Sequence, residues 1–176
     1  MRKGVPATEV LDLYDSTGTY VCGTVERGTA APSGTFLMLT AVMTLRSDGR
    51  FLMTHRASAK KYAGRWEITG GCVRSGETPL QGAVRELYEE TGIRADEQEL
   101  TLCGTFRRAG YIHNFYLLKR DVPDRVLRMQ PGETDAYRWV TTDEYLTLTA
   151  AHQTIPQHTT LIAAAYGKYI GIPKQE

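Results

Sequence analysis

The sequence predicts an α+β fold, and three observations support this. Short strand-like segments separated by turn residues fill the first 56 residues, one capped amphipathic helix follows near residues 79–91, and further strands precede helices at the end of the chain. With 176 residues, 41% of them hydrophobic, the chain is long enough to bury a full core yet short enough for one domain. We therefore expect a single domain over residues 1–176.

Two short apolar segments, residues 10–14 and 20–25, flank the turn-forming sequence Asp15-Ser16-Thr17-Gly18. This arrangement predicts an N-terminal hairpin over about residues 9–27. Residues 28–34 contain glycine and proline and predict a linker. Because the linker detaches the hairpin from the core pattern, the hairpin is a candidate contact for a homodimer.

The next segments predict the centre of the core. Residues 36–45 are nearly all apolar, as expected for a strand that is covered on both faces. Ser47-Asp48-Gly49 predicts a turn into a second strand at residues 50–56. We expect this hairpin to be the spine of the core.

Local signals define the helix at residues 79–91. Thr78 and Gln81 fit a capping box, Pro79 suits the first helical position, and Gly92 supplies a left-handed stop. Apolar residues recur at helical spacing and predict one stripe that docks on the core, made of Leu80, Ala83, Val84 and Leu87.

The chain beyond this helix alternates between strands and helices. Residues 100–108 and 111–119 predict a strand pair, and residues 136–140 predict a short strand. A second helix is expected to open at Thr141 or Thr142, where the following acidic residues favour its positive end. A last amphipathic helix is expected over about residues 155–169.

Three carboxylates, Glu86, Glu89 and Glu90, lie within five consecutive positions of the first helix and off its apolar stripe. Residues three and four apart on a helix are neighbours, so these like charges repel one another. Two charges about 6 Å apart repel by roughly 3 kcal/mol at an effective dielectric near 20, so a cleft that keeps them ionised requires a cation. Hard oxygen ligands favour Mg²⁺ or Mn²⁺.

The whole segment GCVRSGETPLQGAVRELYEETGI, residues 71–93, resembles the Nudix box: Gly, five residues, Glu, seven residues, then Arg-Glu-aliphatic-any-Glu-Glu-any-Gly-aliphatic. Every specified position is filled, by Gly71, Glu77, Arg85, Glu86, Leu87, Glu89, Glu90, Gly92 and Ile93. The resemblance implies the Nudix fold, an α/β/α sandwich around a mixed sheet. It also implies metal-dependent hydrolysis of a pyrophosphate linkage in a nucleoside diphosphate derivative or related organic pyrophosphate.

The resemblance assigns roles to the box residues. It implies that Glu86, Glu89 and Glu90 bind divalent cations, with the Gly71 carbonyl as a further ligand. Arg85 is expected to pair with Glu89 or to reach back to Glu77 as a brace, and an ordinary surface pair is the alternative.

A general base that takes the proton of the attacking water would assist this hydrolysis. Glu89 or Glu90 is one candidate for it, when not occupied by metal. Glu133, in the turn-rich sequence Gln130-Pro131-Gly132-Glu133-Thr134-Asp135, is the other. The family often takes a base from a loop in this region, although a solvated loop acid is the alternative reading of Glu133.

Candidates for substrate binding are basic and aromatic. Basic residues surround the end of the central hairpin, namely Arg46, Arg56, Lys60, Lys61 and Arg65. One or two of these are expected to hold phosphate oxygens, with Arg56 the best single candidate and Arg65 also considered. Tyr111, His113 and Phe115 alternate on one strand and could stack on a base, whereas an aromatic core stripe is the alternative.

Residues 9–145 loosely resemble the Nudix branch that contains isopentenyl-diphosphate isomerase. The segment that would carry the isomerase cysteine is ASAKKYAGRW, residues 57–66, which has neither cysteine nor histidine. Cys72 is the nearest thiol, and it lies inside the box, where a buried structural role is expected. Isomerisation and non-catalytic nucleotide binding therefore remain as alternatives to hydrolysis.

Charge and cysteine content limit the other possibilities. The chain has 21 basic and 20 acidic residues, so its formal net charge of +1 gives no case for attraction to a nucleic-acid polymer or a membrane. Its three cysteines lack CxxC spacing, which argues against a zinc site or disulfide framework. The first ten residues lack an apolar signal segment, and we expect a soluble cytoplasmic protein that acts on a small-molecule pyrophosphate.

Overall fold

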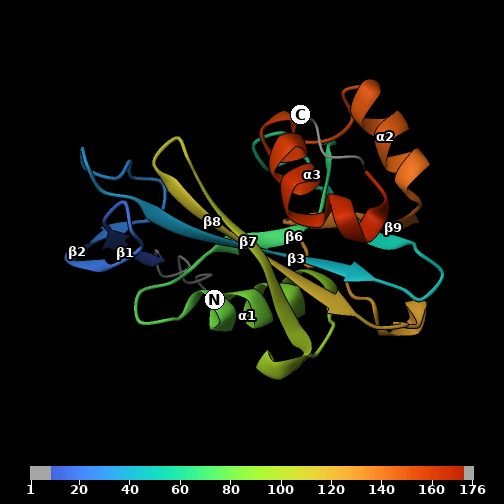
Figure 1. The fold of residues 1–176 in the computed structure, drawn as a ribbon, viewed down its shortest axis with the longest axis horizontal. Helices are drawn as coiled ribbons and strands as arrows, with labels where there is room; N and C mark the ends of the chain where they lie inside the picture. The colour runs from blue at the N-terminus through green and yellow to red at the C-terminus, as the bar shows by residue number, and fades with distance from the viewer. Residues whose placement is uncertain (1–8, 173–176) are drawn as a thin grey trace, which may run out of the picture.

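The computed structural model describes residues 9–172, and in it a mixed sheet lies between helices on both faces (Figure 1). Helix α1 (Pro79–Thr91) covers one face, and helices α2 (Thr142–Ala150) and α3 (Pro156–Ile170) cover the other. The predicted α+β class is confirmed, as is its layered α/β/α arrangement. No helix among the described residues is long and apolar enough to cross a membrane.

Strand β3 (Leu37–Leu45) lies at the centre of the sheet. It runs parallel to β8 (Tyr111–Lys119) along its whole length and antiparallel to the short strand β6 (Thr69–Cys72). Strand β7 (Leu100–Arg108) pairs with the far side of β8, as predicted from the sequence. The single-turn 3-10 helices η1 (Glu97–Glu99) and η2 (Asp124–Val126) belong to the connections.

Strand β4 (Phe51–Arg56) departs from β3 directly after their turn. The two strands pair only at Leu45 and Phe51, after which β4 pairs with β9 (Thr134–Val140) on one side and β5 (Trp66–Glu67) on the other. The expectation of a continuous central hairpin was therefore wrong beyond its turn, because β6 occupies the place beside β3. The chain from β5 to β6 therefore bridges the end of β4 and the beginning of β3.

The side chains of the sheet alternate between two core layers. On the α2 and α3 side, Met43 and Phe51 pack with Tyr166, whose hydroxyl donates to the carbonyl of Tyr116 at 2.7 Å. On the other side, residues such as Val42 pack against α1. Covering on both faces explains why the sequence of β3 is apolar almost throughout.

Helix α1 has the predicted ends. The Gln81 backbone N–H donates to the Thr78 hydroxyl at 3.1 Å, and the Gln81 side chain accepts from the Thr78 N–H at 2.9 Å. Gly92 ends the helix in a left-handed conformation with φ of 77°. Ala83 and Leu87 are fully buried, so the apolar stripe docks on the sheet and fixes which way the acidic residues face. The cap of α2 is Thr141, the first of the two predicted positions.

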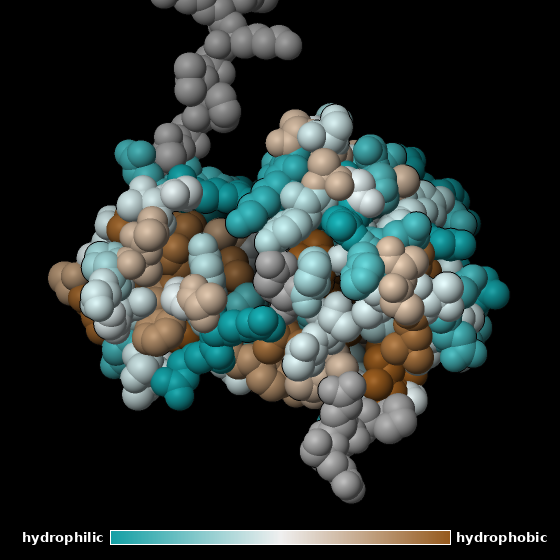
Figure 2. All heavy atoms as spheres, turned by 90° about the horizontal axis from the view of Figure 1, so that it is seen from above, coloured by the Kyte–Doolittle hydropathy of each residue, from teal (hydrophilic) through white to brown (hydrophobic). Residues whose placement is uncertain are grey.

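The N-terminal hairpin, β1 (Val10–Tyr14) and β2 (Tyr20–Glu26), packs on the core rather than standing apart. Tyr14 and Phe36 exchange two backbone hydrogen bonds of 3.0 and 2.8 Å, and Leu11 packs on Leu37. The detachment that motivated a homodimer contact is therefore absent, and the homodimer stays a prediction. Figure 2 shows apolar surface at the end of the molecule that carries this hairpin, where Val10, Tyr20 and Val21 are exposed.

Candidate active site

The glutamates of α1 face β6. The exposed fractions of Glu86 and Glu90 are only 7% and 6%, whereas Glu89 is partly exposed. The Gly70 N–H donates to the Glu90 carboxylate at 3.1 Å. A Cβ at Gly71 would lie 2.3 Å from the Glu86 Oε1 atom, so only glycine lets the carboxylate lie this close to the strand.

Arg85 braces this face of the helix. Its guanidinium donates to both carboxylate oxygens of Glu77, at 2.7 and 2.9 Å, and to Glu86 and Glu89 at 2.7 and 3.1 Å. It also donates to the Cys72 carbonyl at 2.9 Å, which ties the helix to β6. Although burial alone would lower the pKa of Arg85, its bonds to the glutamates raise it above its ordinary value. Both alternatives for Arg85, the pair with Glu89 and the reach to Glu77, are present together.

The N-terminal hairpin joins the same network. Arg74 donates to Glu89, at 3.3 Å to each carboxylate oxygen, and to Glu9 at 2.8 Å. Glu9 also forms an ion pair with Arg27 at the end of β2. Burial tends to raise the pKa of Glu9, but the two arginines hold it below its ordinary value.

The electrostatics of the buried glutamates favour a bound cation. Burial raises the pKa of Glu90 well above its ordinary value, and the charges of Glu67 and Glu86 raise it further. Burial also raises the pKa of Glu86, even though Arg85 opposes this. These carboxylates supply only oxygen ligands, which suits Mg²⁺ or Mn²⁺.

No three His, Cys, Asp or Glu side chains of residues 9–172 already converge as a metal-ligand set. Arg85 and Arg74 hold the oxygens of Glu86 and Glu89 in the arrangement described above. The donor chemistry of these carboxylates nevertheless fits a divalent cation.

A cavity of about 120 Å³ opens over these glutamates, and we call it the glutamate cavity. Its charged lining residues come from segments far apart in the sequence and are Glu9, Arg27, Arg56, Lys60, Arg74, Glu86, Glu89, Glu90 and Glu133. Glu133, from the loop before β9, is thus brought to the metal-binding candidates. It forms an ion pair with Lys60, so it is not an isolated loop acid.

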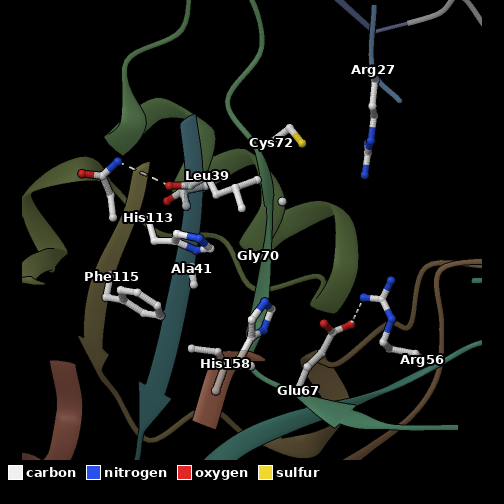
Figure 3. Close-up of a pocket in the computed structure, with 14 residues that line it drawn as sticks. Arg27, Leu39, Ala41, Arg56, Glu67, Gly70, Cys72, His113, Phe115 and His158 are labelled. Atoms are coloured by element: carbon white, nitrogen blue, oxygen red, sulfur yellow. Dashed lines mark hydrogen bonds and ion pairs between the residues drawn. The ribbon is translucent and has the colours of Figure 1, made fainter. Parts of the chain in front are cut away.

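A second cavity, of about 170 Å³, adjoins the first at Gly70 and is drawn in Figure 3; we call it the histidine pocket. His113 from β8 and His158 from α3 both point into it. Burial lowers the pKa of both histidines, that of His158 to about 4, so both rings are neutral near pH 7. A neutral imidazole offers one hydrogen-bond donor and one acceptor to a ligand.

The substrate-binding candidates divide into two groups. Arg56 lines both cavities, pairs with Glu67 and donates to the Lys61 carbonyl at 2.8 Å, whereas Arg65 lines neither cavity. Phe115 is 3% exposed and packs on Tyr166 with ring centroids 5.7 Å apart, so it belongs to the core and presents only one side to the histidine pocket.

Tyr111 lines a wider, outer hollow of about 490 Å³ that continues from the histidine pocket, and we call it the outer hollow. Its ring centroid lies 6.1 Å from that of His113. The two rings meet edge to face. Because His113 lines both the histidine pocket and the outer hollow, Tyr111 beside it borders the route from that pocket to the surface.

Several residues of the site were not predicted from the sequence. Glu67 is buried beside Arg56, and burial raises its pKa to about 7 despite that partner. Arg27, Glu9 and His158 lie far from the box in sequence, and no local pattern marks them. Only the sequence Trp66-Glu67-Ile68-Thr69-Gly70 just before the box could have drawn attention to Glu67.

Cys72 lines the histidine pocket, but burial raises the pKa of its thiol. It is a thiol rather than a reactive thiolate at neutral pH. Cys22, Cys72 and Cys103 are all free.

Comparisons of the sequence and the fold with known proteins identify relatives of this chain. The NUDIX domain profile matches residues 37–161. The chain is 37% identical over 106 residues to a MutT-like protein of Streptomyces ambofaciens, a match covering 59% of this chain and 63% of that protein, less than two thirds of its length. It is 34% identical over 112 residues to the CTP pyrophosphohydrolase of Escherichia coli K12, covering 64% of this chain and 82% of the relative.

The fold also has solved counterparts. The crystal structure of DR0079 from Deinococcus radiodurans superposes with a TM-score of 0.74 and covers 90% of this chain and 99% of that one. At 21% sequence identity this likeness shows a shared fold. It includes most of the chain outside the profile match.

Proposed function

Because the chain belongs to the NUDIX domain family, we propose that it is a divalent-metal-dependent hydrolase that cleaves a pyrophosphate linkage in a nucleoside diphosphate derivative or related organic pyrophosphate. We propose further that residues 1–176 form one domain with this activity. Three free cysteines and a near-neutral charge support a role in the reducing cytoplasm, on a small molecule rather than a nucleic-acid polymer.

One observation carries the proposal: the carboxylate of Glu90 is buried and faces further acids, and among the described residues its only hydrogen-bond donor is the Gly70 N–H. Burying like charges without a cation is unfavourable, so this arrangement is best explained by a bound metal. Glu86, Glu89 and Glu90 would hold it, with the Gly71 carbonyl as a further candidate ligand. Bound Mg²⁺ or Mn²⁺ would neutralise charge on the phosphate oxygens and acidify the attacking water.

The other residues of the glutamate cavity orient the reactants. Glu133 is the candidate base that takes a proton from water as the new P–O bond forms and the bridging P–O bond breaks. Lys60, its ion-pair partner, keeps it in place at the rim. Arg56 is positioned for phosphate oxygens, and Arg85 holds the carboxylates in orientation. The products are a phosphomonoester and the phosphorylated remainder of the substrate.

The alternatives lack comparable support. An isomerase of the isopentenyl-diphosphate type needs a catalytic thiol, and the pKa of Cys72 is raised by burial. The family match does not single out that branch. A binding-only role would leave the paired Glu133 and Lys60 above the glutamates without a chemical purpose.

The test is a panel of nucleoside triphosphates, nucleotide sugars, dinucleoside polyphosphates, coenzyme-type pyrophosphates and prenyl diphosphates, assayed with Mg²⁺ or Mn²⁺. We expect at least one to release a phosphomonoester. Glu90→Gln should abolish turnover while the circular dichroism spectrum stays unchanged. Binding of a nucleotide without turnover under any metal condition would instead favour the regulatory alternative.

A further inference from the structure

Two arginines, Arg27 and Arg56, connect every part of the site. They alone line the glutamate cavity, the histidine pocket and the outer hollow among the described residues. The hollow also contains Lys61 and Arg108 and is lined by no described Asp or Glu. A ligand that extends from the glutamates to the hollow must pass the two guanidiniums.

The two side chains approach from different parts of the fold. Arg56 stands at the end of β4, and Arg27 follows β2 in the N-terminal hairpin, outside the segment matched by the family profile. Figure 3 shows them on the side of the pocket nearest Gly70, with Arg27 entering from the hairpin and Arg56 from the opposite direction beside Glu67. Both side chains line all three cavities, so a group held in these cavities lies beside both guanidiniums.

The hairpin is held firmly enough to position Arg27. The Arg27 N–H donates to the Glu9 carbonyl at 2.8 Å, closing the hairpin. Asp12 accepts from the Ser75 hydroxyl at 2.6 Å and from the Gly76 N–H at 2.9 Å, so the hairpin is bonded directly to the loop that leads into α1. The Arg27 side chain is nonetheless 42% exposed, and Glu9 is its only ion-pair partner among residues 9–172.

Resting on the hydrolase assignment above, we propose that Arg27 and Arg56 form an arginine clamp for the phosphate on the organic side of the scissile bond, with the organic group in the histidine pocket. Guanidinium groups bind phosphate through paired N–H donors, which a flexible ammonium does not reproduce. The hairpin is then part of the substrate site. The ligand class is an organic diphosphate that keeps one phosphate attached to its organic group.

The clamp is tested by binding inorganic pyrophosphate in EDTA, measured by calorimetry, because this probe requires neither metal nor turnover. Arg27→Met should weaken binding ten- to a hundredfold, the loss expected for charge-assisted hydrogen bonds. Arg27→Lys should recover part of it. Arg107→Met is the matched control: Arg107 donates to the Ser16 carbonyl of the hairpin turn and lines none of the three cavities.

Glu9→Gln separates the clamp from a structural role of Arg27. If Arg27 merely holds Glu9 and Arg74 in place, Glu9→Gln should reproduce the binding defect of Arg27→Met. The clamp predicts that Glu9→Gln binds pyrophosphate at least as tightly as the wild type, because it removes a negative charge beside the phosphate and leaves the Arg27 guanidinium in place. A wild type that does not bind pyrophosphate, or an Arg27→Met variant that binds as well as wild type, overturns the clamp.

Kinetics with the best substrate of the panel give an independent measurement. Arg27→Met should raise KM at least tenfold and change kcat less than threefold, because Arg27 lies beyond the reacting bond. Loss of kcat with unchanged KM would contradict the clamp. A chain that binds pyrophosphate through Arg27 but hydrolyses nothing would preserve the clamp and refute the hydrolase proposal.

Discussion

Two neighbouring glycines on β6 should respond in opposite ways to the same substitution. At Gly71, an added Cβ would lie 2.3 Å from Glu86 Oε1 and 2.4 Å from its carboxyl carbon. At Gly70, it would lie 2.4 Å from the Thr40 carbonyl oxygen and 3.0 Å from the Ala41 Cα. The first obstacle is the end of a flexible side chain, whereas the second is backbone of the central strand.

The expected losses of activity and stability depend on whether the obstructing atoms can move. Ordinary contact needs about 3.5 Å or more, so in Gly71→Ala the Glu86 carboxylate must move by about 1 Å. A shift of that size at a catalytic group costs about a hundredfold in rate, while the fold loses about 1 kcal/mol or less. In Gly70→Ala the strands must separate, which costs about 3 kcal/mol, or a melting temperature lower by about 6–12 °C.

Thermal unfolding monitored by circular dichroism, together with turnover of the best substrate in saturating Mg²⁺, measures both effects. Gly71→Ala should melt within a few degrees of the wild type and have at most about one hundredth of its kcat. Wild-type activity in Gly71→Ala would show that the position of Glu86 does not matter for catalysis. Equal destabilisation by both substitutions would show that the Glu86 side chain cannot move aside any more easily than the backbone of β3.

Three further predictions concern other parts of the site. Asp12→Ala should lower kcat/KM about tenfold by loosening Ser75 in the loop before α1, and an unchanged value in steady-state kinetics would refute this. Glu133→Gln should lower kcat a hundredfold or more at neutral pH, as for a lost general base, with the far-ultraviolet spectrum unchanged; a loss below threefold would remove Glu133 from that role. The pKa of His158 is about 4 in the folded chain and 6.5 in the unfolded chain. Between these two pH values the unfolded chain binds a proton on His158 that the folded chain does not bind. The free energy of unfolding should therefore fall as the pH drops from 6.5 towards 4. His158→Phe should flatten that dependence in denaturant titrations, and an NMR-measured pKa of His158 near 6.5 would contradict it.

Local signals in the sequence predicted most elements of the fold. The capping box, Pro79 and Gly92 set both ends of α1 without help from tertiary structure. Turn residues and apolar alternation likewise set the strand pair β7 and β8. The departure of β4 from β3 was not predictable, because it depends on a long-range competition in which β6 pairs with β3 and β9 pairs with β4.

The site was predicted where one element carries it and missed where several meet. Glu86, Glu89 and Glu90 share one helix, so their spacing alone placed them together. Arg27 and His158 reach the site from opposite ends of the chain, through packing that no local pattern encodes. Phe115 shows the limit of alternation as a signal, because it belongs to the core whereas Tyr111 and His113, which alternate with it, line the outer hollow.

The buried position of Tyr166 determines where the C-terminal boundary of an expressed fragment of this protein should lie. The family match ends at residue 161, in the middle of α3, whereas Tyr166 is fully buried and bonds to the Tyr116 carbonyl. A fragment trimmed to the matched boundaries would lack Tyr166 and the rest of α3, so the apolar residues that pack with Tyr166, such as Met43 and Phe51, would lose part of their cover. Such a fragment should precipitate on expression, whereas a fragment of residues 9–172 keeps α1, α2 and α3 whole.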